Sequence, residues 1–134
     1  MTADEIKRLQ QSWAAATVSP DKFTEKFYAN VFELDPELRT LFRRSMGMQG
    51  KKLYSMFSTV VDYMGESQRY IVPLVAAGRR HTQYGIKEKD FETVRQALMK
   101  TLADELKDGF DAETRLVWEM AYNTIATVMR SSLY

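Results

Sequence analysis

The chain of 134 residues has room for one domain with one core, and its 45% hydrophobic and 12% aromatic residues are typical of a globular protein. Nineteen basic and eighteen acidic residues give a net charge of +1, so the total charge offers no argument for nucleic-acid binding, and no concentrated basic stripe is evident. The absence of cysteine excludes disulfides, thiolate metal sites, iron–sulfur clusters and a cysteine nucleophile.

The first residues, "MTADEIKRLQ", lack the apolar segment of a signal peptide. No run of the chain approaches the ~20 apolar residues that cross a bilayer. We therefore expect a cytoplasmic protein with no nucleic-acid or membrane partner.

Helical spacing of apolar residues begins at the N-terminus. Thr2 and Glu5 form a capping-box pattern, which predicts a first amphipathic helix over residues 3–17. The "SP" pair at 19–20 starts a second helix with a wide aromatic face. The "DP" pair at 35–36 starts a short third helix that runs through 41–42.

The second half of the chain is also expected to be helical. "RRSMGMQG" at 43–50 has the composition of a loop, and a longer helix follows it to Gly65. A helix is expected over 68–82, "TQYGIKEKD" is expected to turn, and another helix covers 91–102. Asp111 caps the last helix. Because no segment alternates with the period of a strand, the fold class is all-α with six or seven helices.

His81, in "GRRHTQYGI", is the only histidine. A lone histidine also fits an ordinary surface or hydrogen-bonded position. The chain has no G-x-S-x-G elbow, no glycine-rich phosphate loop and no Glu-x-x-His pair, and a site with several histidines is impossible. Haem remains compatible, because it needs only one axial imidazole from the protein.

The chain resembles the globin family. The stretches "KFYANVFELDPELRTLF", "RRHTQYGI", "FETVRQALM" and "VWEMAYNTIATVM" are similar to globin helices, and Tyr28, Pro36 and Phe42 have the globin separations of eight and six residues. The resemblance covers nearly the whole chain and is nearest to bacterial single-domain globins, which are related to the globin domain of flavohaemoglobins. It implies one globin domain over 1–134, a three-over-three helical sandwich that lacks the short fourth helix, and haem b.

The resemblance also implies the residues around the haem. His81 becomes the proximal iron ligand, held by a backbone carbonyl near Ala77. Phe42 stacks on the haem, although it also fits an ordinary core aromatic. Lys52 and Arg80 pair with the propionates or are solvated surface charges. The cofactor contacts are then Phe42, Lys52, Leu53, Ala77, Arg80, His81, Ile86, Phe91, Val94 and Leu98, several of which plain core packing also predicts.

On the distal side the resemblance places Tyr28, Gln49, Leu53 and Phe42 around the gaseous ligand. Tyr28 and Gln49 donate hydrogen bonds to dioxygen, unless the Tyr28 hydroxyl simply bonds a backbone carbonyl. Gly50 lets its helix cross the second helix closely, opposite Thr24. Without a second histidine, an internal sixth ligand is limited to Tyr28, Lys51 or Lys52, and we expect an open or water-bound site.

The chain departs from the flavohaemoglobin pattern in two places. That pattern has a tyrosine ten residues after the proximal histidine, where this chain has Phe91, and a glutamate near the end of the last helix, where it has "RSSLY". A weak electronic push on the iron is implied, and a peroxidase role loses support.

We expect a reversible oxygen-binding protein for storage, delivery or scavenging, which also binds nitric oxide and carbon monoxide. The alternatives are a nitric-oxide dioxygenase or nitrite reductase served by a separate reductase, then a gas or redox sensor. A haemless helical interaction domain comes last. We expect a monomer or weak homodimer.

Overall fold

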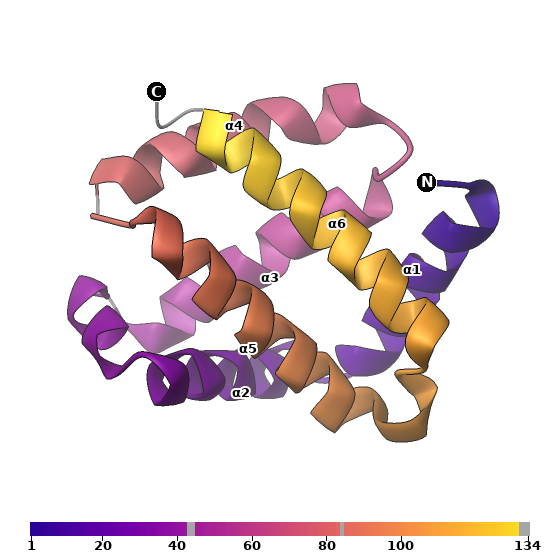
Figure 1. Ribbon diagram of the computed structural model, residues 1–134, viewed down its shortest axis with the longest axis horizontal. Helices are drawn as coiled ribbons and strands as arrows, with labels where there is room; N and C mark the ends of the chain where they lie inside the picture. Colours follow the sequence, from indigo (N-terminus) through magenta and orange to yellow (C-terminus); the bar gives the residue numbers. More distant parts are fainter. Residues whose placement is uncertain (43–44, 84, 132–134) are drawn as a thin grey trace.

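The computed structural model describes residues 1–42, 45–83 and 85–131, without the side chains of 81–83 (Figure 1). Within these residues the chain forms six α-helices and two short 3-10 helices and no strand, as the sequence predicts. The helices in chain order are α1 Ala3–Ala16, α2 Pro20–Leu34, η1 Pro36–Leu41, α3 Met46–Asp62, α4 Ser67–Gln83, α5 Glu88–Leu106, η2 Lys107–Gly109 and α6 Ala112–Ser131.

Two of the predicted caps form, at Thr2 and Asp111, whereas the side chain of Ser19 makes no cap hydrogen bond to the described part of α2. The Thr2 hydroxyl accepts a hydrogen bond from the Glu5 amide at 3.1 Å, and the Glu5 carboxylate accepts one from the Thr2 amide at 2.7 Å. Before α6, the Asp111 carboxylate accepts a hydrogen bond from the Thr114 amide at 2.8 Å, which lowers the pKa of Asp111. These bonds satisfy amides that have no partner within their own helix.

The predicted loop at 43–50 is partly wrong, because α3 already begins at Met46. The Ser45 hydroxyl accepts a hydrogen bond from the Met48 amide at 3.2 Å and caps the helix, so two glycines are tolerated in its first turns. The predicted turn "TQYGIKEKD" is also shorter than expected. Helix α4 continues to Gln83 and α5 starts at Glu88, where the Asp90 carboxylate accepts a hydrogen bond from the Lys87 amide at 2.8 Å.

The helices pack in two crossing layers around one core. Helix α2 packs on α3 and α5, α1 packs on α3 and α6, and α4 packs on α6. In Figure 1 α5 and α6 face the viewer, and α3 crosses behind them. The largest fully buried side chains are Trp118, Phe23, Phe27 and Phe57. No helix in the described part of the chain has the length and apolar character needed to span a membrane.

The predicted close crossing of α2 and α3 at Gly50 is confirmed. A Cβ atom added to Gly50 would lie 2.7 Å from the Thr24 hydroxyl oxygen and 3.2 Å from the Thr24 Cβ. Real Cβ atoms essentially never make a contact of 2.7 Å. The crossing fixes how closely α3, which carries Gln49, approaches α2, which carries Tyr28.

We therefore expect Gly50→Ala to lower the free energy of unfolding by about 1–3 kcal/mol, the usual cost of an overpacked core. Gly47 is the matched control, because it lies in the same helix and a Cβ there has nothing within 4 Å. Gly47→Ala should raise stability by about 0.5–1 kcal/mol through helix propensity. Urea unfolding followed by circular dichroism measures both. Equal stability of the two variants would show that the α2–α3 crossing does not require glycine.

Candidate functional site

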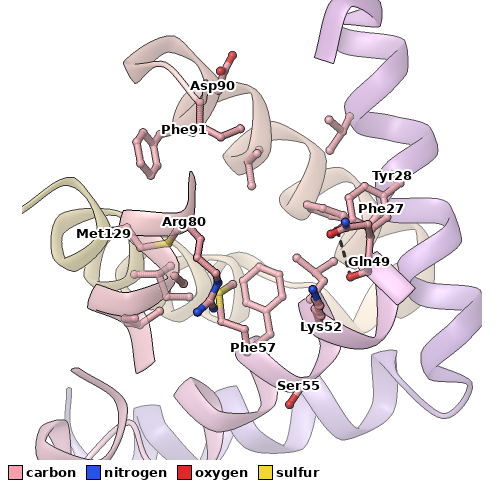
Figure 2. Close-up of a pocket in the computed structure, with 18 of the residues that line it drawn as sticks. Phe27, Tyr28, Gln49, Lys52, Ser55, Phe57, Arg80, Asp90, Phe91 and Met129 are labelled. Carbon is pink, nitrogen blue, oxygen red and sulfur yellow. Dashed lines mark hydrogen bonds between the residues drawn. The ribbon is translucent and has the colours of Figure 1, made fainter. Parts of the chain in front are cut away.

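A cavity of about 1020 Å³ lies between the two layers. This volume is at the upper end of the range of roughly 300–1,000 Å³ found for small-molecule and cofactor sites. Side chains from α2, η1, α3, α4, α5 and α6 line it (Figure 2). Most of the lining is hydrophobic, including Phe27, Val31, Leu38, Leu41, Phe42, Leu53, Met56, Phe57, Val60, Leu74, Ile125 and Met129.

Tyr28 reaches the cavity from α2. Its side chain is buried, and its hydroxyl donates a hydrogen bond of 3.3 Å to the backbone carbonyl of Gln49 (Figure 2). The bond is long for an O–H donor, whose usual distance is about 2.7–2.8 Å. Burial raises the pKa of Tyr28 far above its ordinary value of 10.0, so the hydroxyl keeps its proton. The structure thus contains the backbone contact that the sequence left as an alternative.

Gln49 lies on α3 beside Tyr28 and lines the same cavity. Its side chain is half-buried, and its amide group makes no hydrogen bond to another described residue. Leu53, one helical turn later, also lines the cavity. Two polar donors, the Tyr28 hydroxyl and the Gln49 amide, therefore stand at one wall of an otherwise apolar space.

Phe42 follows η1 and belongs to an aromatic cluster. Its ring meets Tyr28 edge-on at 5.4 Å between centroids and meets Phe32 at 5.5 Å. Phe42 is half-buried and lines the cavity. The Tyr28 ring also meets Phe27 edge-on at 5.3 Å between centroids, so two edge-on contacts hold it.

Helix α4 forms the wall that carries His81. Ala77, Leu74, Pro73 and Arg80 on this helix line the cavity, and Ala77 is buried. Position 81 belongs to α4, but its side chain lies outside the described residues, so the iron-ligand assignment stays a prediction. The same holds for the carbonyl predicted to hold its ring.

Helix α5 and the turn before it supply another wall. Ile86 in the turn and Phe91 and Val94 on α5 line the cavity, whereas Leu98 is not part of its lining and lies fully buried in the core. Their contacts with haem stay a prediction. Leu98 is one turn beyond Val94 on the same face, where α5 has already passed the edge of the cavity.

Phe91 is fixed by two side chains from α6. The Arg130 guanidinium lies over its ring at 4.8 Å, and the Tyr122 hydroxyl donates a hydrogen bond to its backbone carbonyl at 2.6 Å. Arg130 also forms an ion pair with Glu88 at 2.6 Å. The ring of Phe91, ten residues after His81, is therefore held by a cation–π contact from α6.

Asp90 is a buried carboxylate that the sequence reading did not single out. One of its oxygens caps α5, and the other has no hydrogen-bond partner among the described residues. Asp90 also belongs to the lining of the cavity, and Figure 2 shows its carboxylate at the far edge of the site, away from Gln49 and Lys52. Its place at the start of α5 makes it a helix-capping group.

Basic side chains stand on the exposed side of the cavity. Lys51 and Lys52 on α3 and Arg80 on α4 all contribute to the lining, and all three are exposed. Figure 2 shows Lys52 and Arg80 among the lining side chains. None of the three forms an ion pair with a carboxylate among the described residues. The cavity is thus apolar inside and positively charged at its opening.

Several lining residues were missed by the sequence reading. Met56, Phe57 and Val60 lie three, four and seven residues after Leu53, and Tyr70, Pro73 and Leu74 precede Ala77 at the same helical spacings. Helical periodicity measured from the predicted contacts would have found both sets. Tyr122, Ile125 and Met129 on α6 repeat at the same period.

Comparisons with known proteins agree with this architecture. The chain is 22% identical to a leghemoglobin of Medicago sativa over 98% of this chain and 97% of the relative. It is 22% identical to an anaerobic nitrite reductase of Oryza sativa subsp. indica, over 92% and 89%. It is also 22% identical to a flavohemoprotein of Vibrio cholerae, over 96% of this chain but only 33% of that longer protein.

The fold is that of a solved haem protein. A crystal structure of a hexacoordinated heme protein from an anhydrobiotic tardigrade matches 99% of this chain and 95% of its own, with a TM-score of 0.88 at 16% identity. The globin family model matches residues 25–129, which include α3, α4, α5 and the walls of the cavity. The chain therefore belongs to the globin family.

Proposed function

We propose that this globin holds haem b in the cavity and binds dioxygen reversibly, for storage, delivery or scavenging. The single observation that carries the proposal is that the Tyr28 hydroxyl and the Gln49 amide stand together at one wall of a large apolar cavity. When bound, ferrous haem supplies an iron that takes up diatomic gases. The leghemoglobin relatives and the position of Tyr28, Phe42 and His81 support the same reading.

The residues around the cavity fit a haem. The apolar lining suits the porphyrin faces, and Lys52 and Arg80 at the opening suit its two carboxylates. His81, on the α4 wall, is the residue that would hold the iron, because it is the only histidine of the chain. We place the protein near the bacterial single-domain globins on the strength of the tyrosine–glutamine pair.

Tyr28 is the principal donor in this proposal. Its hydroxyl has one proton, which is directed at the Gln49 carbonyl at 3.3 Å. Because this bond is long, rotation of the hydroxyl toward a ligand in the cavity costs little. The raised pKa of Tyr28 keeps that proton in place at every physiological pH.

Gln49 is the second donor, and its amide group is free of other described partners. A hydrogen bond in this setting contributes roughly 0.5–1.5 kcal/mol net, up to about tenfold in affinity. Carbon monoxide carries less charge than dioxygen when bound and should gain less from both donors. The pair thus favours slow release of dioxygen.

A gas-cycling experiment tests the proposed function. The purified haem-loaded protein is reduced without oxygen, exposed to air and returned to nitrogen while its absorption spectrum is recorded. We expect the spectrum to change on exposure and to return over repeated cycles. Immediate oxidation to the ferric form on each exposure would overturn reversible oxygen binding.

Nitric-oxide dioxygenase or nitrite reductase activity is the second candidate. The relatives named as a nitrite reductase and a flavohemoprotein favour it, and the basic opening suits the entry of an anion such as nitrite. Consumption of nitric oxide with an added reductase separates the two candidates. Consumption that stops after one equivalent supports a carrier, and sustained consumption supports the enzyme.

A further inference from the structure

The near-neutral total charge hides a strong separation of charge along the chain. Residues 39–87 contain nine basic side chains but only two acidic ones, a net charge of +7. The rest of the chain contains ten basic and sixteen acidic residues, a net charge of −6. The sequence analysis noted no concentrated basic stripe, but this segment has a clear excess of basic over acidic residues.

The basic segment surrounds the opening of the cavity. In Figure 1, η1, the start of α3, the end of α4 and the start of α5 gather on the left side of the molecule. Six exposed cations of the segment, which we call the cationic rim, either line the cavity or adjoin a residue that does: Arg39, Lys51, Lys52, Arg79, Arg80 and Lys87. Arg43 and Arg44 also belong to the nine basic residues of the segment, but they lie outside the described residues.

The six cations of the cationic rim form no ion pairs within the described residues, although Glu37 on η1 and Glu88 at the start of α5 lie on the same elements. Arg39 instead lies over the Phe32 ring at 5.4 Å. Elsewhere the pattern is reversed, because seven of the ten cations outside the segment form ion pairs, namely Arg8, Lys26, Lys89, Arg95, Lys100, Arg115 and Arg130. Uncompensated charge is thus concentrated at one opening.

Haem carboxylates account for only part of this charge. Two propionates paired with Lys52 and Arg80 would reduce the net charge of the segment from +7 to +5. Four rim cations would then still face solvent around the exposed edge of the cofactor. A patch of this kind attracts anionic partners from a distance and raises their rate of encounter by 10- to 1,000-fold, depending on ionic strength.

We propose that the cationic rim is the docking surface for a small acidic electron-donor protein, which reduces the cofactor through the opening of the cavity. This proposal rests on the proposed haem function. With haem held in the cavity, the donor would give up one electron and the haem would take it, so no proton or further reactant would be needed. A compact acidic protein fits better than a nucleic acid, because the net charge of −6 on the rest of the chain repels a polyanion that extends beyond the rim.

Anaerobic stopped-flow reduction by a reduced plant-type [2Fe–2S] ferredoxin, an acidic one-electron donor, tests the proposal. The test variant is Lys51→Glu with Arg79→Glu, which reverses two rim charges and leaves Lys52, Arg80 and His81 in place. The matched control is Lys7→Glu with Lys22→Glu, which reverses two exposed cations on α1 and α2 that form no ion pair with the described part of the chain. Both variants change the net charge equally.

We expect the second-order rate constant to fall about tenfold or more in the rim variant at low salt, and to stay within about twofold in the control. The difference should disappear as salt is added. Reduction by hexaammineruthenium(II), a cation, should become faster in the rim variant. Equal rates of reduction by ferredoxin in both variants would overturn the docking surface. Binding of a duplex DNA is measured on the same variants. If the rim variant lost DNA binding while its rate of reduction by ferredoxin stayed unchanged, the rim would be a nucleic-acid surface and the proposal would also be overturned. Haem loading is checked first by the Soret band, so a failure of the proposed function itself is seen separately.

Discussion

The His81→Gly variant is expected to lose haem during purification, with an affinity for haem more than about 100-fold below that of the parent chain. This loss is a lower limit, because mutating a group that only orients a metal ligand typically lowers the affinity for the metal 10- to 100-fold. His81 has no replacement, since the chain has no other histidine or cysteine. Haem transfer to an excess of a competing apoglobin, followed at the Soret band, measures the loss.

Added imidazole is the control for this variant. Glycine leaves space on the α4 wall, so free imidazole should restore a stable haem complex if the ring of His81 is the ligand. Circular dichroism of the haem-free forms shows whether α4 still folds. A variant that retained haem with an unchanged spectrum and no response to imidazole would contradict the assignment.

The Tyr28→Phe variant is expected to release dioxygen faster, by about two- to tenfold, which corresponds to one lost hydrogen bond of roughly 0.5–1.5 kcal/mol. The effect should be the same from pH 6 to pH 9, because the raised pKa of Tyr28 leaves its hydroxyl protonated throughout this range. Carbon monoxide release should change less. Stopped-flow displacement of dioxygen by carbon monoxide measures the rate.

Tyr122→Phe is the matched control for the loss of a buried hydroxyl. Tyr122 also lines the cavity, but its hydroxyl donates to the Phe91 carbonyl at 2.6 Å, and burial raises its pKa as well. Its removal should lower stability through the loss of this buried hydrogen bond while leaving the release rate near that of the parent. If both variants accelerated release equally, the Tyr28 hydroxyl would have no specific part in holding the ligand.

The helices could be predicted from the sequence because they depend on periodicity and caps. The cavity residues that were named beforehand came from the globin resemblance, and they are a minority of its lining. The Gly50–Thr24 crossing could also be predicted, since a glycine on a packed helix face indicates a close approach. The start of α3 was harder to predict, because the two glycines in "MGMQG" suggest a loop. In the structure the Ser45 cap stabilises the helix despite these glycines.

Features that depend on side-chain placement could not be predicted. The direction of the Tyr28 hydroxyl depends on where the Gln49 carbonyl lies after α2 and α3 have packed. The exclusion of Leu98 from the cavity depends on where α5 leaves its edge. The cationic rim combines residues from η1, α3, α4 and the turn before α5, and their lack of carboxylate partners is visible only in three dimensions.

Titration of the haem-free protein with ferric haem tests the central claim most directly, because every proposed role depends on one haem in the cavity. We predict a sharp end point at one haem per chain, with a Soret band and quenching of the emission of Trp13 and Trp118, which lie in the adjoining core. A Soret absorbance that rises gradually without an end point would contradict the account. The same titration curve in the His81→Gly variant would contradict it too.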